Sequence, residues 1–179
     1  MPITPDTKNW TWVIARRCPE CGFDASTLDV VTLPALIRRN ASVWTTVLAG
    51  AGVANRPDDS TWSHLEYAAH VRDVLRVYRA RVALMMTEDD PLYQNWDQDA
   101  TAVDDNYGAQ NPAVVAEELT VAAEALAADF ARLRGDDWNR PGRRSDGAQF
   151  TIATLGAYFA HDIEHHLVDV GRELVQSTS

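Results

Sequence analysis

Residues 161–170 read HDIEHHLVDV, and this stretch predicts both a helix of the core and a candidate site. Ile163, Leu167 and Val170 recur at the spacing of one helical face, which predicts a helix packed against a core on that side. The same stretch holds three of the chain's five histidines, with two aspartates and a glutamate. Because ionisable side chains are rarely fully buried unless they are paired or metal-bound, the cluster indicates a metal site on this helix, with a solvated polar face as the alternative.

Candidate ligand pairs on this helix lie four residues apart, a spacing that brings Cβ atoms to about 5–6 Å. With about 100° of rotation per residue from Ile152 on the core face, Asp162 and His166 fall on one flank. By the same count, His161 and His165 fall almost opposite the core. We expect the first pair to face a groove beside the core. The residues alone leave open whether the outward pair serves that groove metal instead.

A second helix is predicted to follow Ser63, because Glu66 three residues later has the spacing of a capping box. The helix should continue to about Met86. His70 lies on its apolar side and is expected to supply a third ligand to the groove, whereas His64 is predicted to be at the surface. Two histidines and an aspartate from two helices leave a position for water or substrate, as a catalytic metal requires.

Two carboxylates are expected to orient these ligands by hydrogen bonding to the imidazole rings from outside the metal. Asp73 follows His70 by three residues, and Asp169 lies on the flank of the last helix that carries the groove pair. No residue is assigned a proton-transfer role in catalysis. Arg72 and Arg76 belong to a stripe of arginines that is predicted to be the solvated face of the second helix.

Four amphipathic segments make an all-α four-helix bundle the expected fold, with residues 29–179 as one domain. No strand-like alternation appears, so no sheet is expected, and residues 89–111 and 136–149 are predicted to be loops. The aromatic residues of the first loop indicate that it covers a site. The expected helices span about residues 33–48, 63–86, 112–135 and 150–174.

The acidic composition of the chain restricts its partners. The net charge of −10, from 26 acidic and 16 basic residues, argues against nucleic acid, because phosphate binding needs a basic surface. No apolar run is long enough to cross a membrane, and the N-terminal region lacks the apolar stretch of a signal peptide. We therefore expect a cytoplasmic protein with no membrane partner, and a homodimer is left open as its assembly.

Residues 1–28 show no sustained periodicity and are predicted to form an irregular N-terminal arm. Within the arm, Cys18-Pro-Glu-Cys21-Gly has the form of a zinc knuckle, which supplies two of the four ligands of a closed structural site. If the arm folds back onto the last helix, the outward pair of His161 and His165 would supply the other two. The alternatives are free thiols beside a solvated histidine pair, or a redox role for the cysteines.

The motif WSHLEYAAH at residues 62–70, together with HHLVDV at 165–170, resembles the DinB-like bundles. This family includes the mycothiol-dependent maleylpyruvate isomerases and the bacillithiol transferases. The resemblance covers about residues 30–175 and implies the same four-helix bundle. It also implies one metal-binding histidine from the second helix, here His70, and a ligand pair four residues apart on the last helix.

In register with the family's final-helix motif, that ligand pair is Asp162 and His166, which agrees with the facing argument made from the residues. The family has histidine or glutamate where Asp162 stands, and the shorter side chain could loosen this bond or alter the metal preference. The arm with its two cysteines is not part of the common bundle.

Two functions from different classes follow. The first is a divalent-metal-dependent enzyme, with zinc or nickel as the expected metal, that activates a low-molecular-weight thiol such as mycothiol. The thiolate would react with a small-molecule electrophile in S-transfer, isomerisation or detoxification. The alternative is a non-catalytic metal-binding bundle that acts as a binding module. A turnover assay with thiol and electrophile separates the two.

Overall fold

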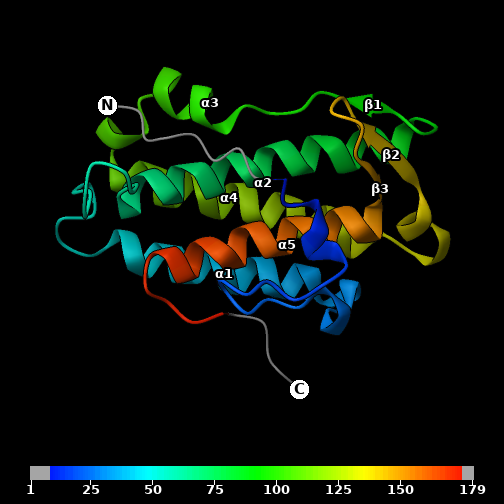
Figure 1. Cartoon of the computed structure of the whole chain (residues 1–179), viewed down its shortest axis with the longest axis horizontal. Helices are drawn as coiled ribbons and strands as arrows, with labels where there is room; N and C mark the ends of the chain where they lie inside the picture. The colour runs from blue at the N-terminus through cyan, green and yellow to red at the C-terminus, as the bar shows by residue number, and fades with distance from the viewer. Residues whose placement is uncertain (1–8, 175–179) are drawn as a thin grey trace.

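The computed structural model describes residues 9–174, and it is a four-helix bundle, as predicted. Figure 1 shows the long helices running side by side, with a short helix and a small sheet at the edges. Their apolar faces meet in one core that includes Trp44, Leu119 and Phe159. The long helices are α1 (Leu33–Leu48), α2 (His64–Thr87), α4 (Pro112–Arg132) and α5 (Ile152–Asp169).

Local capping signals set the starts of the helices. The Ser63 hydroxyl accepts a hydrogen bond from the Glu66 backbone, and the Glu66 carboxylate accepts one from the Ser63 backbone. Asn111 caps α4, whose first residue, Pro112, has no backbone donor to satisfy. The predicted starts of α2 and α4 are confirmed, as are both ends of α1.

The order of the helices around the bundle brings α2 and α5 together. Helix α4 packs most extensively against α1 and α2, and α5 packs against the same two helices. Consecutive helices α1 and α2 therefore lie diagonally across the bundle. The two helices with the predicted groove ligands are neighbours as a result.

Helix α5 ends earlier than predicted, at Asp169 instead of about Leu174. Gly171 has a φ of 71°, the left-handed conformation that glycine adopts without steric cost, and the chain turns there. The Arg172 backbone N–H closes the turn on the Leu167 carbonyl at 2.8 Å. The helix signal in the sequence continued past a residue that stops the helix through its backbone.

A three-stranded sheet at one end of the bundle corrects the expectation of no sheet. Its strands are too short to show an alternating pattern in the sequence. Gly142 allows the sheet to pack on α2, because a Cβ at this position would lie 2.8 Å from Met85 Sδ. The strands are β1 (Leu92–Tyr93), β2 (Pro141–Arg144) and β3 (Gln149–Thr151), with β1 parallel and β3 antiparallel to β2.

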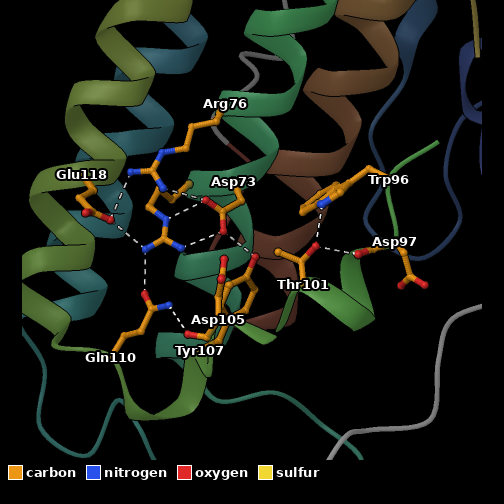
Figure 2. A network of polar contacts seen from close by, with 10 residues as sticks. Asp73, Arg76, Trp96, Asp97, Thr101, Asp105, Tyr107, Gln110 and Glu118 are labelled. Atoms are coloured by element: carbon orange, nitrogen blue, oxygen red, sulfur yellow. Dashed lines mark hydrogen bonds and ion pairs between the residues drawn. The ribbon is translucent and has the colours of Figure 1, made fainter. Parts of the chain in front are cut away.

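Residues 89–111, predicted to be a loop, contain strand β1 and the short helix α3 (Gln98–Asp104). A polar network centred on Asp73 of α2 holds this segment in place (Figure 2). Tyr107 donates a hydrogen bond of 2.6 Å to the Asp73 carboxylate, and its ring is almost completely buried. The segment is therefore an ordered cover on α2.

The same network corrects the prediction that Arg72 is solvated. Its guanidinium is buried and donates two hydrogen bonds to Asp73. It also donates to Gln110 at 2.7 Å and to Glu118 of α4 at 2.9 Å. Arg76 is exposed, as predicted. A buried cation needs partners of this kind, and here they come from segments distant in the sequence.

The described part of the N-terminal arm, residues 9–28, lies across α5 (Figure 1). Val13 and Phe23 anchor it, because both side chains are fully buried. The rest of the predicted arm, residues 1–8, lies outside the described residues. Short 3-10 helices are η1 (Thr11–Ile14), η2 (Ala25–Thr27), η3 (Val30–Thr32), η4 (Tyr107–Ala109) and η5 (Gly135–Asn139).

No helix within residues 9–174 is both long and apolar enough to span a bilayer.

We predict that Tyr107→Phe lowers the free energy of unfolding by about 1–3 kcal/mol, because it removes a buried hydrogen bond to a carboxylate. Tyr93→Phe is the matched control, since the Tyr93 hydroxyl is buried and has no hydrogen-bond partner within residues 9–174. The control should leave stability unchanged or raise it. Urea denaturation followed by circular dichroism measures both variants. Equal losses in the two would contradict the stabilising role of the network.

Candidate metal centre

One ligand atom from each of His70, Asp162 and His166 meets between α2 and α5, and all three atoms lie within 4.8 Å of one another. Asp162 Oδ1 is 3.5 Å from His70 Nε2 and 3.2 Å from His166 Nε2. The fold therefore brings together the three residues predicted as groove ligands. Two imidazole nitrogens and a carboxylate oxygen form a donor set that suits zinc or nickel.

His70 is the fully buried member of this group. Its ring is parallel to the Trp96 ring and tilted against the Trp62 ring, with centroids 5.4 Å apart in both cases. Neither ring nitrogen has a hydrogen-bond partner among the described residues. Burial lowers the pKa of His70, which keeps the imidazole neutral and able to bind a cation. A metal ion on Nε2 would offset the cost of burying an unpaired nitrogen.

Asp169 lies where the sequence analysis placed an orienting carboxylate. Its Oδ2 accepts a hydrogen bond of 2.8 Å from His166 Nδ1, which directs the opposite ring nitrogen at Asp162. Burial alone would lower the pKa of His166, but hydrogen bonds with Asp162 and Asp169 raise it to about 9. Burial also opposes ionisation of Asp162, yet His166 and His70 hold the pKa of its carboxyl well below the usual range.

Asp73 does not orient His70 directly, which corrects its predicted role. Its carboxylate accepts hydrogen bonds from Arg72 and Tyr107, and none joins it to His70 among the described residues. Its effect on the centre is indirect. The network around Asp73 holds the segment that carries Trp96, and the Trp96 ring covers His70.

A cavity of about 440 Å³ opens beside this group, with Asp162 in its wall. Sequence reasoning predicted that the aromatic segment with Trp96 covers a site but missed the other lining residues, although one signal was present. Arg81 follows His70 by eleven residues, which is close to three helical turns and so the same face of α2. The larger side chains around the cavity are Trp10, Tyr78, Arg81, Trp96, Arg144 and Tyr158.

The outward pair, His161 and His165, belongs to a different cluster. Its ligand atoms meet those of Cys18 and Cys21 from the arm, all within 4.8 Å of one another. The structure thus divides the histidines of α5 between two groups. Among the described residues, Asp162 and His166 are the ones that group with His70.

The sequence matches the DinB superfamily over residues 36–169, a range that contains the three groove residues but not the cysteines of the arm. Among solved structures, the chain is similar to YfiT from Bacillus subtilis, described as a probable metal-dependent hydrolase with an unusual four-helix bundle topology. The TM-score is 0.64 at 17% identity, over 80% of this chain and 87% of YfiT, so this likeness concerns the fold. No curated protein matches the sequence.

We predict that His166→Ala lowers the zinc content of the protein by one equivalent per chain, because it removes a groove ligand. Asp169→Asn should weaken binding at the groove about 10- to 100-fold, as expected for a residue that orients a ligand. His64→Ala is the control, since His64 is exposed at the start of α2. Zinc titration against a chromophoric chelator measures all three. Unchanged zinc binding in His166→Ala would rule out this centre.

Proposed function

This chain belongs to the DinB superfamily, and from that premise we propose that it is a metal-dependent enzyme that activates a low-molecular-weight thiol of the mycothiol kind. The observation that carries the proposal is His70, which is fully buried and has no hydrogen bond to either ring nitrogen among the described residues. Its Nε2 lies 3.5 Å from Asp162, which also contacts His166 and lines a cavity. The small-molecule electrophile that receives the thiol would occupy this cavity.

The donor set supports zinc or nickel held by His70, Asp162 and His166. When bound, such an ion would lower the pKa of a thiol at its remaining coordination position and hold it as the thiolate. The chain itself supplies the surroundings. Trp96 and Trp62 exclude water from the His70 ring, and the cavity leaves Asp162 accessible from one side.

The cavity also indicates the charge of the substrate. Arg81 is buried, and no carboxylate of residues 9–174 forms an ion pair with it. Its guanidinium lies 5.1 Å from the ring centroids of both Tyr78 and Tyr93 and donates to the Gln94 carbonyl at 3.3 Å. A buried cation facing a cavity fits an anionic ligand group. We infer that the thiol or the electrophile carries a carboxylate that binds Arg81.

Hydrolysis is the second candidate function, favoured by the description of YfiT as a probable metal-dependent hydrolase. The same three residues and cavity would serve it, with water in place of the thiol as nucleophile. A binding module without turnover remains the non-catalytic alternative. A cytoplasmic setting, which supplies reduced thiols, belongs to the proposal.

We predict that the zinc- or nickel-loaded protein conjugates mycothiol to an electrophile such as monochlorobimane. His70→Ala should reduce the rate by more than about 100-fold, beyond the range typical of residues that only orient ligands. His64→Ala, on the same helix, should keep the wild-type rate. Thiol consumption and product formation are followed together. Cleavage of ester or amide substrates without thiol would instead support hydrolysis, and no turnover of either kind would leave the binding module.

We predict that Arg81→Met raises KM for a carboxylate-bearing substrate on the order of 10- to 100-fold, because hydrogen bonds to charged groups contribute about 1.5–3 kcal/mol. The substitution keeps the bulk of the side chain and should change kcat much less. Arg79→Met is the control, since Arg79 is exposed on α2 and pairs with Asp129 on the outer surface. An equal effect of both variants on KM would contradict the anion-binding role.

A further inference from the structure

The second cluster on α5 is built from two parts of the chain that lie far apart in the sequence. Cys18 and Cys21 come from the arm, and His161 and His165 come from the side of α5 that faces away from the core. We propose that these four residues bind a structural zinc ion that fastens the arm to the helix. The proposal does not depend on the function proposed for the groove, because the two clusters share no ligand.

The spacing of the four side chains fits a tetrahedral ion. Cys18 Sγ lies 3.9 Å from His165 Nδ1, and all four ligand atoms lie within 4.8 Å of one another. Zinc–sulfur bonds of about 2.3 Å and zinc–nitrogen bonds of about 2.0–2.1 Å place sulfur and nitrogen about 3.6 Å apart at tetrahedral angles. The Cys18–His165 pair is therefore within a few tenths of an ångström of this spacing, and the 4.8 Å limit leaves the other pairs within reach of small side-chain rotations.

His161 supplies an independent observation that points to a ligand. Its side chain is 4% exposed, and its Nε2 has no hydrogen-bond partner among the described residues. A neutral imidazole nitrogen carries a lone pair that can bind a cation. An unpaired buried nitrogen on a ring that clusters with two thiols is costly for the fold unless a cation joins them.

The backbone of the arm presents both thiols on one side of a tight turn. The Gly22 N–H donates to the Cys18 carbonyl at 2.9 Å, and the Cys18 N–H donates to the Phe23 carbonyl at 2.8 Å. The Phe23 N–H points at Cys21 Sγ at 3.4 Å, a contact that favours the thiolate. Gly22 has a φ of 83°, which a residue with a Cβ rarely adopts.

Carboxylates behind the cluster orient His165. With Nδ1 facing Cys18, the opposite nitrogen, Nε2, lies 3.7 Å from both Glu20 Oε2 and Asp169 Oδ1. Metal-bound histidines usually direct their second nitrogen toward a carboxylate in this way. Four protein ligands leave no open position, so the ion would be structural. Its binding would release the two thiol protons.

The geometry disfavours a redox role for the cysteines. Reactive cysteines are accessible and have a depressed pKa, whereas Cys18 is fully buried and burial raises the pKa of Cys21 to about 12. The two cysteines form no disulfide. The cluster therefore gains most from a cation that replaces the thiol protons.

The zinc would also shape the cavity beside the groove. The Trp10 ring packs against His161 and His165, with centroids 5.5 Å and 5.2 Å apart. The same tryptophan lines the cavity whose wall contains Asp162. Fastening the arm to α5 thus fixes one wall of the cavity.

The test uses cobalt(II) as a spectroscopic probe in the full-length chain, because only this cluster contains sulfur. The metal-exchanged wild-type protein should show an intense thiolate-to-cobalt charge-transfer band in the near ultraviolet and bind two equivalents. His166→Ala should lose one equivalent and keep the band. Cys21→Ser, at a half-buried position, should lose one equivalent together with the band. Absence of the band in wild type, with both thiols freely titratable or joined in a disulfide, would overturn the proposal.

A second measurement needs no cysteine variant and guards against misfolding. X-ray absorption at the zinc edge should show sulfur scatterers at about 2.3 Å in the wild-type protein. Zinc removal should also expose the arm to trypsin at Arg16 and Arg17, which are exposed residues next to Cys18. His166→Ala, with its arm site intact, should resist trypsin as wild type does. A zinc edge with only nitrogen and oxygen scatterers would refute the site.

Discussion

The 3.6-residue period of α5 places successive residues in different surroundings, and the rest of the molecule is arranged around that helix. Ile163 and Leu167 face the core, whereas Asp162 and His166 turn toward α2. His161 sits one residue before Asp162 and faces the arm instead. Each face of the helix is therefore covered by a different part of the chain. The core, the groove beside α2 and the contact with the arm each use one face of α5.

The cover on α2 shows how a buried network can act at a distance. Asp73 accepts hydrogen bonds from Arg72 and Tyr107, and these bonds order the segment between β1 and α4. The same segment carries Trp96, whose indole N–H donates to Thr101 at 2.8 Å (Figure 2). The Trp96 ring lies parallel to the His70 ring. Within residues 9–174, no hydrogen bond joins the Asp73 network to the three groove residues. One short segment connects them, because its Tyr107 contacts Asp73 and its Trp96 packs on His70.

Much of the fold and the groove could be predicted from the sequence because the signals are local. The capping box at Ser63 and the facing of His70 and His166 depend only on helical geometry, and the structure agrees with them. The predictions were wrong where a residue's burial depends on partners distant in the sequence. Arg72 is buried because Glu118 and Gln110 reach it from elsewhere.

The sheet and the cavity were not predicted for the same reason. Strands of two to four residues are stabilised by their pairing, which no single segment reveals. The cavity beside the groove combines Arg81 of α2 with Arg144 of β2 and Trp10 of the arm. A helical wheel can place Arg81 on the face of His70, but only the assembled chain shows that a cavity lies in front of it.

Asp169 gives one carboxylate to both clusters. Its Oδ2 lies 2.8 Å from His166 Nδ1, and its Oδ1 lies 3.7 Å from His165 Nε2. When cations occupy both clusters, the Asp169 carboxylate interacts with both histidines, and its stronger interaction with one weakens its interaction with the other. Thermodynamic linkage then makes the effect mutual: the factor by which the first ion alters affinity for the second is the same in either order. The two sites would be thermodynamically coupled, so that the metal affinity of the groove depends on whether the arm cluster holds an ion.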